Sequence, residues 1–329
     1  MRMLILINLL LFQFASIGQD GLYDNSIERI EFLDVIVSAP LQSKVLIGDR
    51  LYEVAESRQV MKANRSGSSN SRSFASRSEL GVLIGGSYYT GDLNRMGHFQ
   101  QIEPAGGLVF RYNVHSRLAL RVNALYGNVK GDDKLSPYEF QRNRNLSFRS
   151  PIIELAIGFE FNYFQYEIGN SKYWITSYMF GGVGGFYMNP KANYNGQWVE
   201  LRQLGTEGQG TPLSNDNPYS LTQLCIPMGL GVKMNVGKRV AISFEYGLRL
   251  TFTDYIDDVS GNYVDSDALA QINGTIAAEL SDRSLVKLGH NGSNAGYRRG
   301  DPNNKDWYSF FGMMISFQLG NPGTCWSGR

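Results

Sequence analysis

The chain lacks any run of apolar residues as long as the roughly 20 that a membrane-crossing helix requires. Its most apolar segment, Met3–Phe12, is much shorter, follows the basic Arg2 and precedes small residues such as Ala15. A basic start, a short apolar core and small residues in this order are typical of a secretory signal peptide, which we predict over residues 1–18. No cysteine follows the apolar core, so we expect no lipid anchor there.

The sequence also has no excess of either charge, since 31 basic and 30 acidic residues leave a net charge of +1. This balance gives no argument for binding to nucleic acid. The three histidines, His98, His115 and His290, lie far apart and match neither metal-ligand spacing nor a Ser–His–Asp arrangement. We therefore predict no catalytic, metal-binding or cofactor-binding residue, and a protein that is not an enzyme.

One group of acidic residues needs its own explanation. Asp254, Asp257, Asp258, Asp265 and Asp267 fall in a single predicted loop. Calcium prefers such oxygen ligands, but the spacing is not that of an EF-hand. Turn formation and helix capping are simpler roles for aspartate, and we favour them here.

A strict alternation of side chains marks the stretch Arg239–Asp258. Every second residue from Val240 to Phe252 is aliphatic or aromatic, whereas the residues between them are small, polar or charged. Alternate side chains of a strand point to opposite faces. The stretch is longer than an ordinary strand and suits a tilted strand that crosses a bilayer, which needs about 9–11 residues.

Seven further segments show related alternation. They are Glu79–Tyr89, Pro104–Asn113, Leu118–Val129, Ile152–Phe164, Tyr173–Tyr187, Leu221–Met234 and Trp307–Leu319. Pro227 predicts a local break in the sixth strand, and the glycines from Gly181 to Gly185 predict a bulge or sharp bend in the fifth.

The connections alternate in length. Short turns at Val114–Ser116, Gly169–Asn170 and Asn235–Lys238 contrast with long loops at Lys130–Pro151, Asn189–Ser220 and Thr253–Asp306, the last with a helix over Asp265–Leu280. This asymmetry is typical of outer-membrane barrels, whose short turns and termini are periplasmic. We predict an all-β, eight-stranded antiparallel transmembrane β-barrel with long extracellular loops, one of them with a short helix. A soluble β-sandwich or lipocalin-like barrel is the alternative, and the export signal, strand length and loop asymmetry favour the membrane.

The predicted inward face carries four acids and four bases. An eight-stranded barrel is only wide enough for side chains to fill, and buried charges must be paired. We therefore predict a closed, salt-bridged lumen rather than a channel or a catalytic Glu154–Glu160 pair. The predicted lumen charges are Glu79, Arg111, Arg121, Glu154, Glu160, Lys233, Glu245 and Arg249.

Residues 19–78 form a predicted periplasmic arm before the barrel, which spans residues 79–319, and residues 320–329 form a periplasmic tail. The arm contains β-type runs at Glu28–Val37 and Lys44–Ile47, a weak helical pattern over Asp49–Ala63, and a Ser-rich linker from Asn64. Strand addition to a partner and plain disorder are both open for it.

The two cysteines fall at opposite ends of the predicted barrel. Cys225 lies near the outer end of the sixth strand and Cys325 lies in the tail, so they are a membrane thickness, on the order of 30 Å, apart. We expect no bond between them, and Cys325 is the one free to pair with a partner protein.

Several segments resemble the PorG-type outer-membrane barrels of the type IX secretion system in Bacteroidota. They are Glu79–Asn94, Gly184–Ala192, Trp198–Gly210 and Thr253–Tyr263, together with Arg111–Asn113 and Glu245–Phe252. The LGTEGQG and DYIDDVSG sequences are the distinctive ones, whereas the N-terminal arm has no match in this pattern.

The resemblance implies a structural role in protein secretion and, in gliding species, in motility. Its implied partners are a PorK/GldK-like ring lipoprotein and a PorN/GldN-like ring protein, which the barrel anchors to the outer membrane. A small-barrel surface adhesin and an outer-membrane enzyme with a site at the extracellular rim are the alternatives. From topology, we expect partner contacts on the periplasmic side, at Phe32, Val35, Val37, Leu51, His115, Arg117, Gly169, Lys238, Cys325 and Trp326.

Overall fold

The computed structural model describes residues 44–47, 50–53, 77–95, 97–289 and 292–320. The chain divides into two units, Met1–Gly67 and Ser68–Arg329. The first contains an antiparallel hairpin of β1 (Lys44–Ile47) and β2 (Arg50–Glu53). The strand predicted at Lys44–Ile47 is present, but the helix predicted from Asp49 is wrong over Arg50–Glu53, because cross-strand pairing overrides a weak helical pattern. The run Glu28–Val37 lies outside the described residues.

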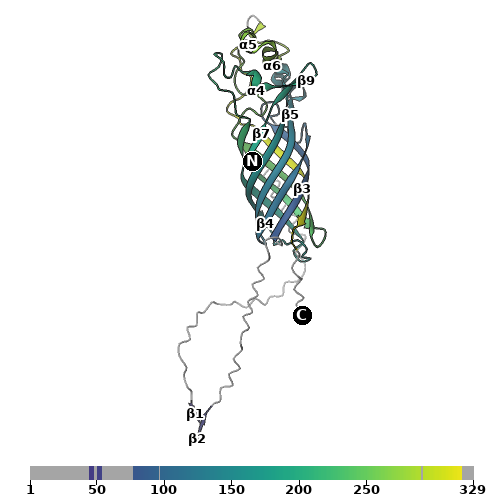
Figure 1. The fold of residues 1–329 in the computed structure, drawn as a ribbon, viewed down its shortest axis with the longest axis vertical. Coiled ribbons are helices and arrows are strands. Elements are labelled where there is room, and N and C mark those ends of the chain that lie inside the picture. Colours follow the sequence, from purple (N-terminus) through teal and green to yellow (C-terminus); the bar gives the residue numbers. More distant parts are fainter. Residues whose placement is uncertain (1–43, 48–49, 54–76, 96, 290–291, 321–329) are drawn as a thin grey trace. The chain divides into compact units, whose positions relative to one another are not determined.

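The second unit is built on eight long antiparallel strands, which Figure 1 shows wound around a common axis. Each pairs with the next one along the ring, and the pairing of β5 with β6 closes the sheet on itself. The predicted closed eight-stranded barrel is therefore confirmed. The strands are β3 (Ser78–Thr90), β4 (Glu103–His115), β5 (Leu118–Asp132), β6 (Ser147–Asn162), β7 (Ile175–Met188), β10 (Thr222–Asn235), β11 (Val240–Thr251) and β12 (Trp307–Gln318).

Burial alternates along these strands as the sequence alternates. Ile84 is 68% exposed on the outer face of β3, whereas the preceding Leu83 is 1% exposed and faces inward. The same holds on β11, where Phe244 is exposed and Glu245 is buried. The apolar face of the strands is thus the outer one. This excludes the lipocalin-like alternative, because the apolar face of such a barrel points inward.

Two local predictions about the strands had different outcomes. The ladder between β10 and β7 loses its pairs between Cys225 and Met228, so the break predicted at Pro227 is confirmed. The bulge predicted in β7 is wrong, because β7 keeps one register along β6. Its glycines serve a close approach instead: a Cβ atom at Gly182 would lie 2.3 Å from the carbonyl oxygen of Ile157.

The long connections fold together at one end of the barrel into a cap (Figure 1). The helix predicted over Asp265–Leu280 is divided at Gly274, whose φ is +91°, and helices also lie in the other two long loops, so the prediction of one helical loop is wrong. The cap elements are η1 (Asp133–Leu135), α3 (Glu139–Arg144), β8 (Lys191–Tyr194), β9 (Gln197–Glu200), α4 (Leu201–Leu204), α5 (Ser266–Asn273) and α6 (Thr275–Ser281).

The loop predicted over Lys130–Pro151 is shorter than expected. Strands β5 and β6 stay paired as far as Asp132 and Ser147, and only residues 133–146 connect them. A hydrophobic core that includes Phe148, Ile256 and Leu280 runs from the barrel rim into the cap. None of the described helices is both long and apolar enough to cross a membrane.

Candidate functional site

The inside of the barrel holds a network of six charged side chains, drawn from six strands. Glu160 of β6 is its centre: its carboxylate lies 2.7 Å from Nε of Arg111, 3.1 Å from Nη1 of Arg121 and 2.6 Å from Nζ of Lys233. Arg121 also binds Glu245 at 2.7 Å, and Arg111 lies 3.9 Å from Glu79. Three carboxylates face three cations, so the network is neutral.

The other two predicted lumen charges form a separate pair nearer the cap. Nε of Arg249 lies 2.9 Å from Glu154, and the Tyr308 hydroxyl donates to the same carboxylate oxygen at 2.9 Å. Glu154 and Glu160 therefore belong to different ion-pair groups, and each carboxylate is bound by cations. The acid–base pair considered from the sequence has no support in this geometry.

Aromatic rings fill the space between these charges. The guanidinium of Arg121 lies 4.1 Å from the ring centre of Phe180, and that of Arg249 lies 4.8 Å from Phe310. Cations are attracted to such ring faces, most strongly where water is excluded. The structure thus places all eight predicted residues inside the barrel, buried, with ion pairs and rings packed around them.

The three short turns meet one another at the end opposite the cap. The Tyr166 amide donates to the carbonyl of Ser116 at 3.1 Å, and its hydroxyl donates to Asn235 at 2.7 Å. A Cβ atom at Gly169, whose φ is +81°, would lie 2.4 Å from the carbonyl oxygen of Lys238. Tyr166 and Ile168 pack with Ala241 into a small buried cluster at this end.

A polar cavity of about 280 Å³ opens beside these turns. Its lining includes Glu79, Asn113, His115 and Glu167, and His115 accepts the amide of Arg117 at 3.3 Å. Of the residues predicted to contact a partner, the structure therefore brings His115, Arg117, Gly169 and Lys238 to one end of the barrel. Leu51 lies in the first unit, and Phe32, Val35, Val37, Cys325 and Trp326 lie outside the described residues.

The two distinctive sequence motifs of the chain meet in the cap. Glu207 of LGTEGQG accepts the amides of Ser260 and Gly261 of DYIDDVSG at 2.9 and 3.0 Å. The Thr206 hydroxyl donates to Asp258 at 2.5 Å, and Arg299 binds Glu207 at 2.8 Å. The side chains of Thr206, Glu207, Asp258, Ser260 and Arg299 are all buried. The sequence alone could not pair the motifs, because nothing local in either one indicates the other.

The aspartates of the loop that contains the second motif have separate structural roles. Asp265 caps α5 by accepting the Ala268 amide at 2.8 Å, as expected for a capping aspartate. Asp257 accepts the Val259 amide, and Asp258 accepts the Tyr219 hydroxyl. Burial raises the pKa of Asp258 to about 6 and that of Asp254 to about 7. The described residues contain no cluster of three or more metal-ligating side chains.

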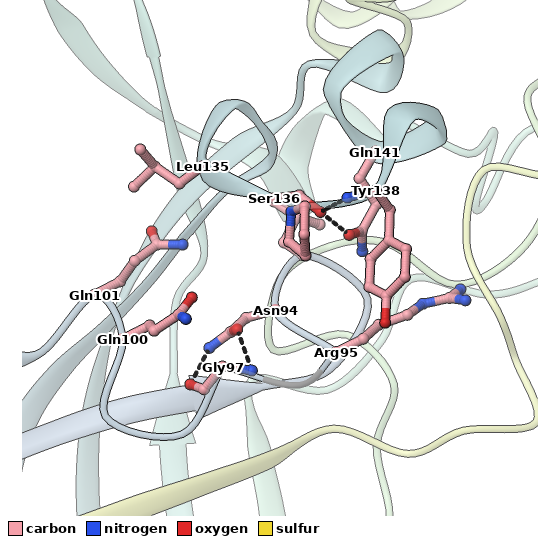
Figure 2. Close-up of a pocket in the computed structure, with 11 residues that line it drawn as sticks. Asn94, Arg95, Gly97, Gln100, Gln101, Leu135, Ser136, Tyr138 and Gln141 are labelled. Atoms are coloured by element: carbon pink, nitrogen blue, oxygen red, sulfur yellow. Dashed lines mark hydrogen bonds between the residues drawn. The ribbon is translucent and has the colours of Figure 1, made fainter.

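A smaller pocket of about 80 Å³ lies in the cap, between the β3–β4 loop and the turn before α3 (Figure 2). Several of its polar groups are already bound to one another. Asn94 donates to the carbonyl of Gly97 and accepts its amide, and Ser136 donates to Gln141. The pocket is therefore part of the cap's own packing.

Cys225 is a free, buried cysteine on the inward face of β10.

Comparison with known proteins begins with the chain's family. Residues 68–279 match the family described as "Domain of unknown function (DUF6089)". The chain belongs to this family. The match covers most of the DUF6089 barrel, from the residues before β3 to α6 in the last long loop. No curated protein matches the chain.

Solved structures similar to this DUF6089 barrel are outer-membrane proteins of low sequence identity. The attachment invasion locus protein Ail of Yersinia pestis, solved with a heparin analogue, is 8% identical, with 73% of this chain and 96% of that chain covered and a TM-score of 0.34. Neisserial surface protein A is 8% identical over 74% and 97%, with a TM-score of 0.36. OprG of Pseudomonas aeruginosa is 9% identical over 74% and 97%, with a TM-score of 0.30.

Proposed function

We propose that this chain is a non-enzymatic component of the outer membrane that anchors a periplasmic ring of the type IX secretion system. The observation that supports the membrane location is a belt of exposed apolar side chains around the barrel. Aliphatic and aromatic side chains stand outward in rows around the barrel, where water would make their exposure costly and lipid makes it favourable. Members of the belt include Val82, Ile84, Leu108, Leu120, Tyr126, Ile153, Leu155, Ile157, Phe159, Val183, Leu224, Phe244, Met313 and Phe317.

The packed lumen supports an anchoring role over a pore. Glu160 and its three cations stand across the barrel interior, and Tyr166 is buried at the end opposite the cap. A neutral, filled interior of this kind offers no aqueous path for a solute. What remains for interaction is the outside of the molecule at its two ends.

The short-turn end is the surface that we assign to the ring. It combines rigid, mutually bonded turns with a polar cavity of about 280 Å³, and such preorganised surfaces lose little entropy on binding. In the proposed orientation this end and both termini are periplasmic. The partners are a PorK/GldK-like lipoprotein and a PorN/GldN-like ring protein, which the sequence resemblance implies. The proposed contacts are His115, Arg117, Gly169 and Lys238 on the barrel, with Phe32, Val35, Val37, Leu51, Cys325 and Trp326 beyond it.

Affinity purification of the tagged full chain from detergent-solubilised envelopes tests the proposal. We expect the ring lipoprotein and its partner to be recovered with the native chain. The double variant Arg117→Glu/Lys238→Glu reverses two charges at the short-turn end and should lower this recovery. The matched variant Arg298→Glu/Lys305→Glu reverses two charges on the cap and should leave it unchanged. Recovery of the native barrel with neither ring protein would sink the proposal.

A further inference from the structure

On the side formed by β5, β6 and β7, the apolar outer face of the barrel ends toward the cap in a row of two tyrosines and an isoleucine, here called the aromatic row. Tyr126 of β5 is paired with Ile153 of β6, and Ile153 is paired with Tyr187 of β7. All three side chains are outward and exposed. Tyrosines at the edge of an apolar belt mark the interface of a bilayer, where the ring is apolar and the hydroxyl is hydrated.

A second outward row lies four residues closer to the cap, and all its members are basic. Lys130 of β5 is paired with Arg149 of β6, and Arg149 is paired with Lys191 of β8. The pairing of Arg149 with Lys191 keeps the register of Ile153 with Tyr187, so the ladder continues past Pro190. Lys130, Arg149 and Lys191 each lie four residues from a member of the aromatic row. Because four is an even number and side chains alternate between faces, the basic row is on the same face as the aromatic row.

The separation of the two rows suits the headgroup region of a membrane. Four residues of strand span about 13 Å, or about 10 Å along the axis of a barrel whose strands tilt by roughly 40°. Headgroups occupy about 5–7 Å beyond the hydrocarbon on each side. The backbone of the basic row therefore lies a few ångströms past the headgroups, and its long lysine and arginine side chains can reach back to the lipid phosphates.

The basic row keeps positive charge after its internal ion pairs are counted. Glu103 is shared between Lys130 and Arg149, with 3.2 Å to Nη2 of the arginine, and Glu200 binds Lys191 at 3.1 Å. Three cations therefore face two carboxylates. The side chains of Lys130 and Arg149 are 40% and 44% exposed. A guanidinium carries five N–H donors, so one contact to Glu103 leaves donors for a phosphate.

We propose that Lys130, Arg149 and Lys191 bind the phosphate of a lipid in the outer leaflet. This inference rests on the proposed membrane location. Charge complementarity and continuity with the apolar belt identify the ligand, because the acyl chains of such a lipid would lie along the Tyr126–Ile153–Tyr187 row while its phosphate reaches the basic row. Arg149 supplies the planar donor pair, and the two lysines supply flanking charge.

Native mass spectrometry of the full chain in uncharged detergent micelles tests the site. The probes are phosphatidic acid, a diacylglycerol with the same acyl chains, and inorganic phosphate. We expect phosphatidic acid to bind and diacylglycerol to bind far more weakly. The double variant Lys130→Gln/Arg149→Gln should weaken phosphatidic acid binding by roughly 10- to 30-fold. Lys191→Gln, which leaves Glu103 paired, should weaken it by less, and Glu103→Gln should strengthen it.

The control variant Arg298→Gln/Lys305→Gln removes two cap charges away from the row and should bind like the native chain. Equal binding of phosphatidic acid and diacylglycerol would overturn the inference, as would equal loss in the control. Full competition by inorganic phosphate would show a site for free phosphate and overturn the lipid assignment. If the chain folds into phosphatidylcholine vesicles yet shows no preference for phosphatidic acid, this inference falls while the membrane location stands.

Discussion

At the scale of single residues, one tyrosine hydroxyl where β3 meets the cap has more acceptors than it can serve. Tyr89 Oη lies 2.5 Å from Asp257 and 2.8 Å from Asp306, and all three residues are buried. A hydroxyl has one proton, and an ionised carboxylate can only accept. One of the two carboxyls must therefore hold a proton. Burial raises the pKa of both aspartates well above the ordinary value, with further repulsion from neighbouring carboxylates.

The pH dependence of the cap follows from these raised pKa values. These aspartates bind more protons in the folded cap than in the unfolded chain, so their contribution to stability is fully present below the ordinary aspartate pKa of about 4 and is lost as pH rises through their raised pKa values. Asp258 and Asp254, with pKa values of about 6 and 7, extend the loss across neutral pH. We expect hydrogen exchange at the Ile256 and Val259 amides, corrected for intrinsic rates, to show easier opening at pH 8 than at pH 5.

Asp306→Asn should reduce this dependence on pH, because the amide still accepts the Ile256 amide but no longer titrates. Asp267→Asn changes an exposed aspartate of α5 and serves as its control. Opening that is independent of pH in the native chain would contradict the shared proton.

The lumen network gives a second prediction at this scale. Glu160→Gln leaves three buried cations with two carboxylates, and the loss of one partner from a buried ion pair costs about 3–5 kcal/mol. Urea unfolding in micelles, followed by the mobility shift of the unboiled barrel on gels, measures the cost. Adding Lys233→Met restores the charge balance and should recover part of it. Exposed Glu139→Gln should change nothing, and an equal effect there would count against the network.

At the scale of elements, alternation predicted the existence of every barrel strand and the outward face of all but β7, whose glycines blur the pattern. The strands β5 and β6 continue beyond their predicted ends because their paired extension, with Lys130 and Arg149, is polar on its outer face and has no apolar alternation to detect. The lumen charges were predictable from the same period of two. Their ion-pair partners were not, since Arg121 and Glu245 are joined only by closure of the sheet.

The glycines of β6 and β7 carry a prediction at this scale. A side chain at Gly182 would meet the carbonyl oxygen of Ile157 at 2.3 Å, which only separation of the two strands can relieve. Gly182→Val should therefore abolish the folded, fast-migrating form of the barrel on unboiled gels. Gly237→Ala, in the β10–β11 turn where a Cβ atom meets nothing within 4 Å, is the control and should fold normally.

At the scale of the whole molecule, the outer belt and the cap should differ in their tolerance of charge. Leu155→Arg puts a cation in the belt, and a lipid-facing arginine near the bilayer midplane costs about 2–4 kcal/mol. Folding into phosphatidylcholine vesicles, assayed by gel mobility, should fall for this variant. Leu285→Arg changes a leucine of the cap that is 71% exposed and should fold as the native chain does. Equal folding of both variants would contradict a bilayer around the belt.

Assembly of the barrel follows from how the lumen network is distributed around the ring of strands. Glu79, Arg111, Arg121, Glu160, Lys233 and Glu245 each come from a different strand, Tyr178 of β7 donates to Glu245, and Arg111 donates to Ser316 of β12. All eight strands thus contribute to one set of contacts. An unclosed sheet would carry these charges without their partners. The last pairing of strands and the neutralisation of the interior therefore occur in the same step. Partly assembled chains are penalised, and closure of the barrel becomes an all-or-none event.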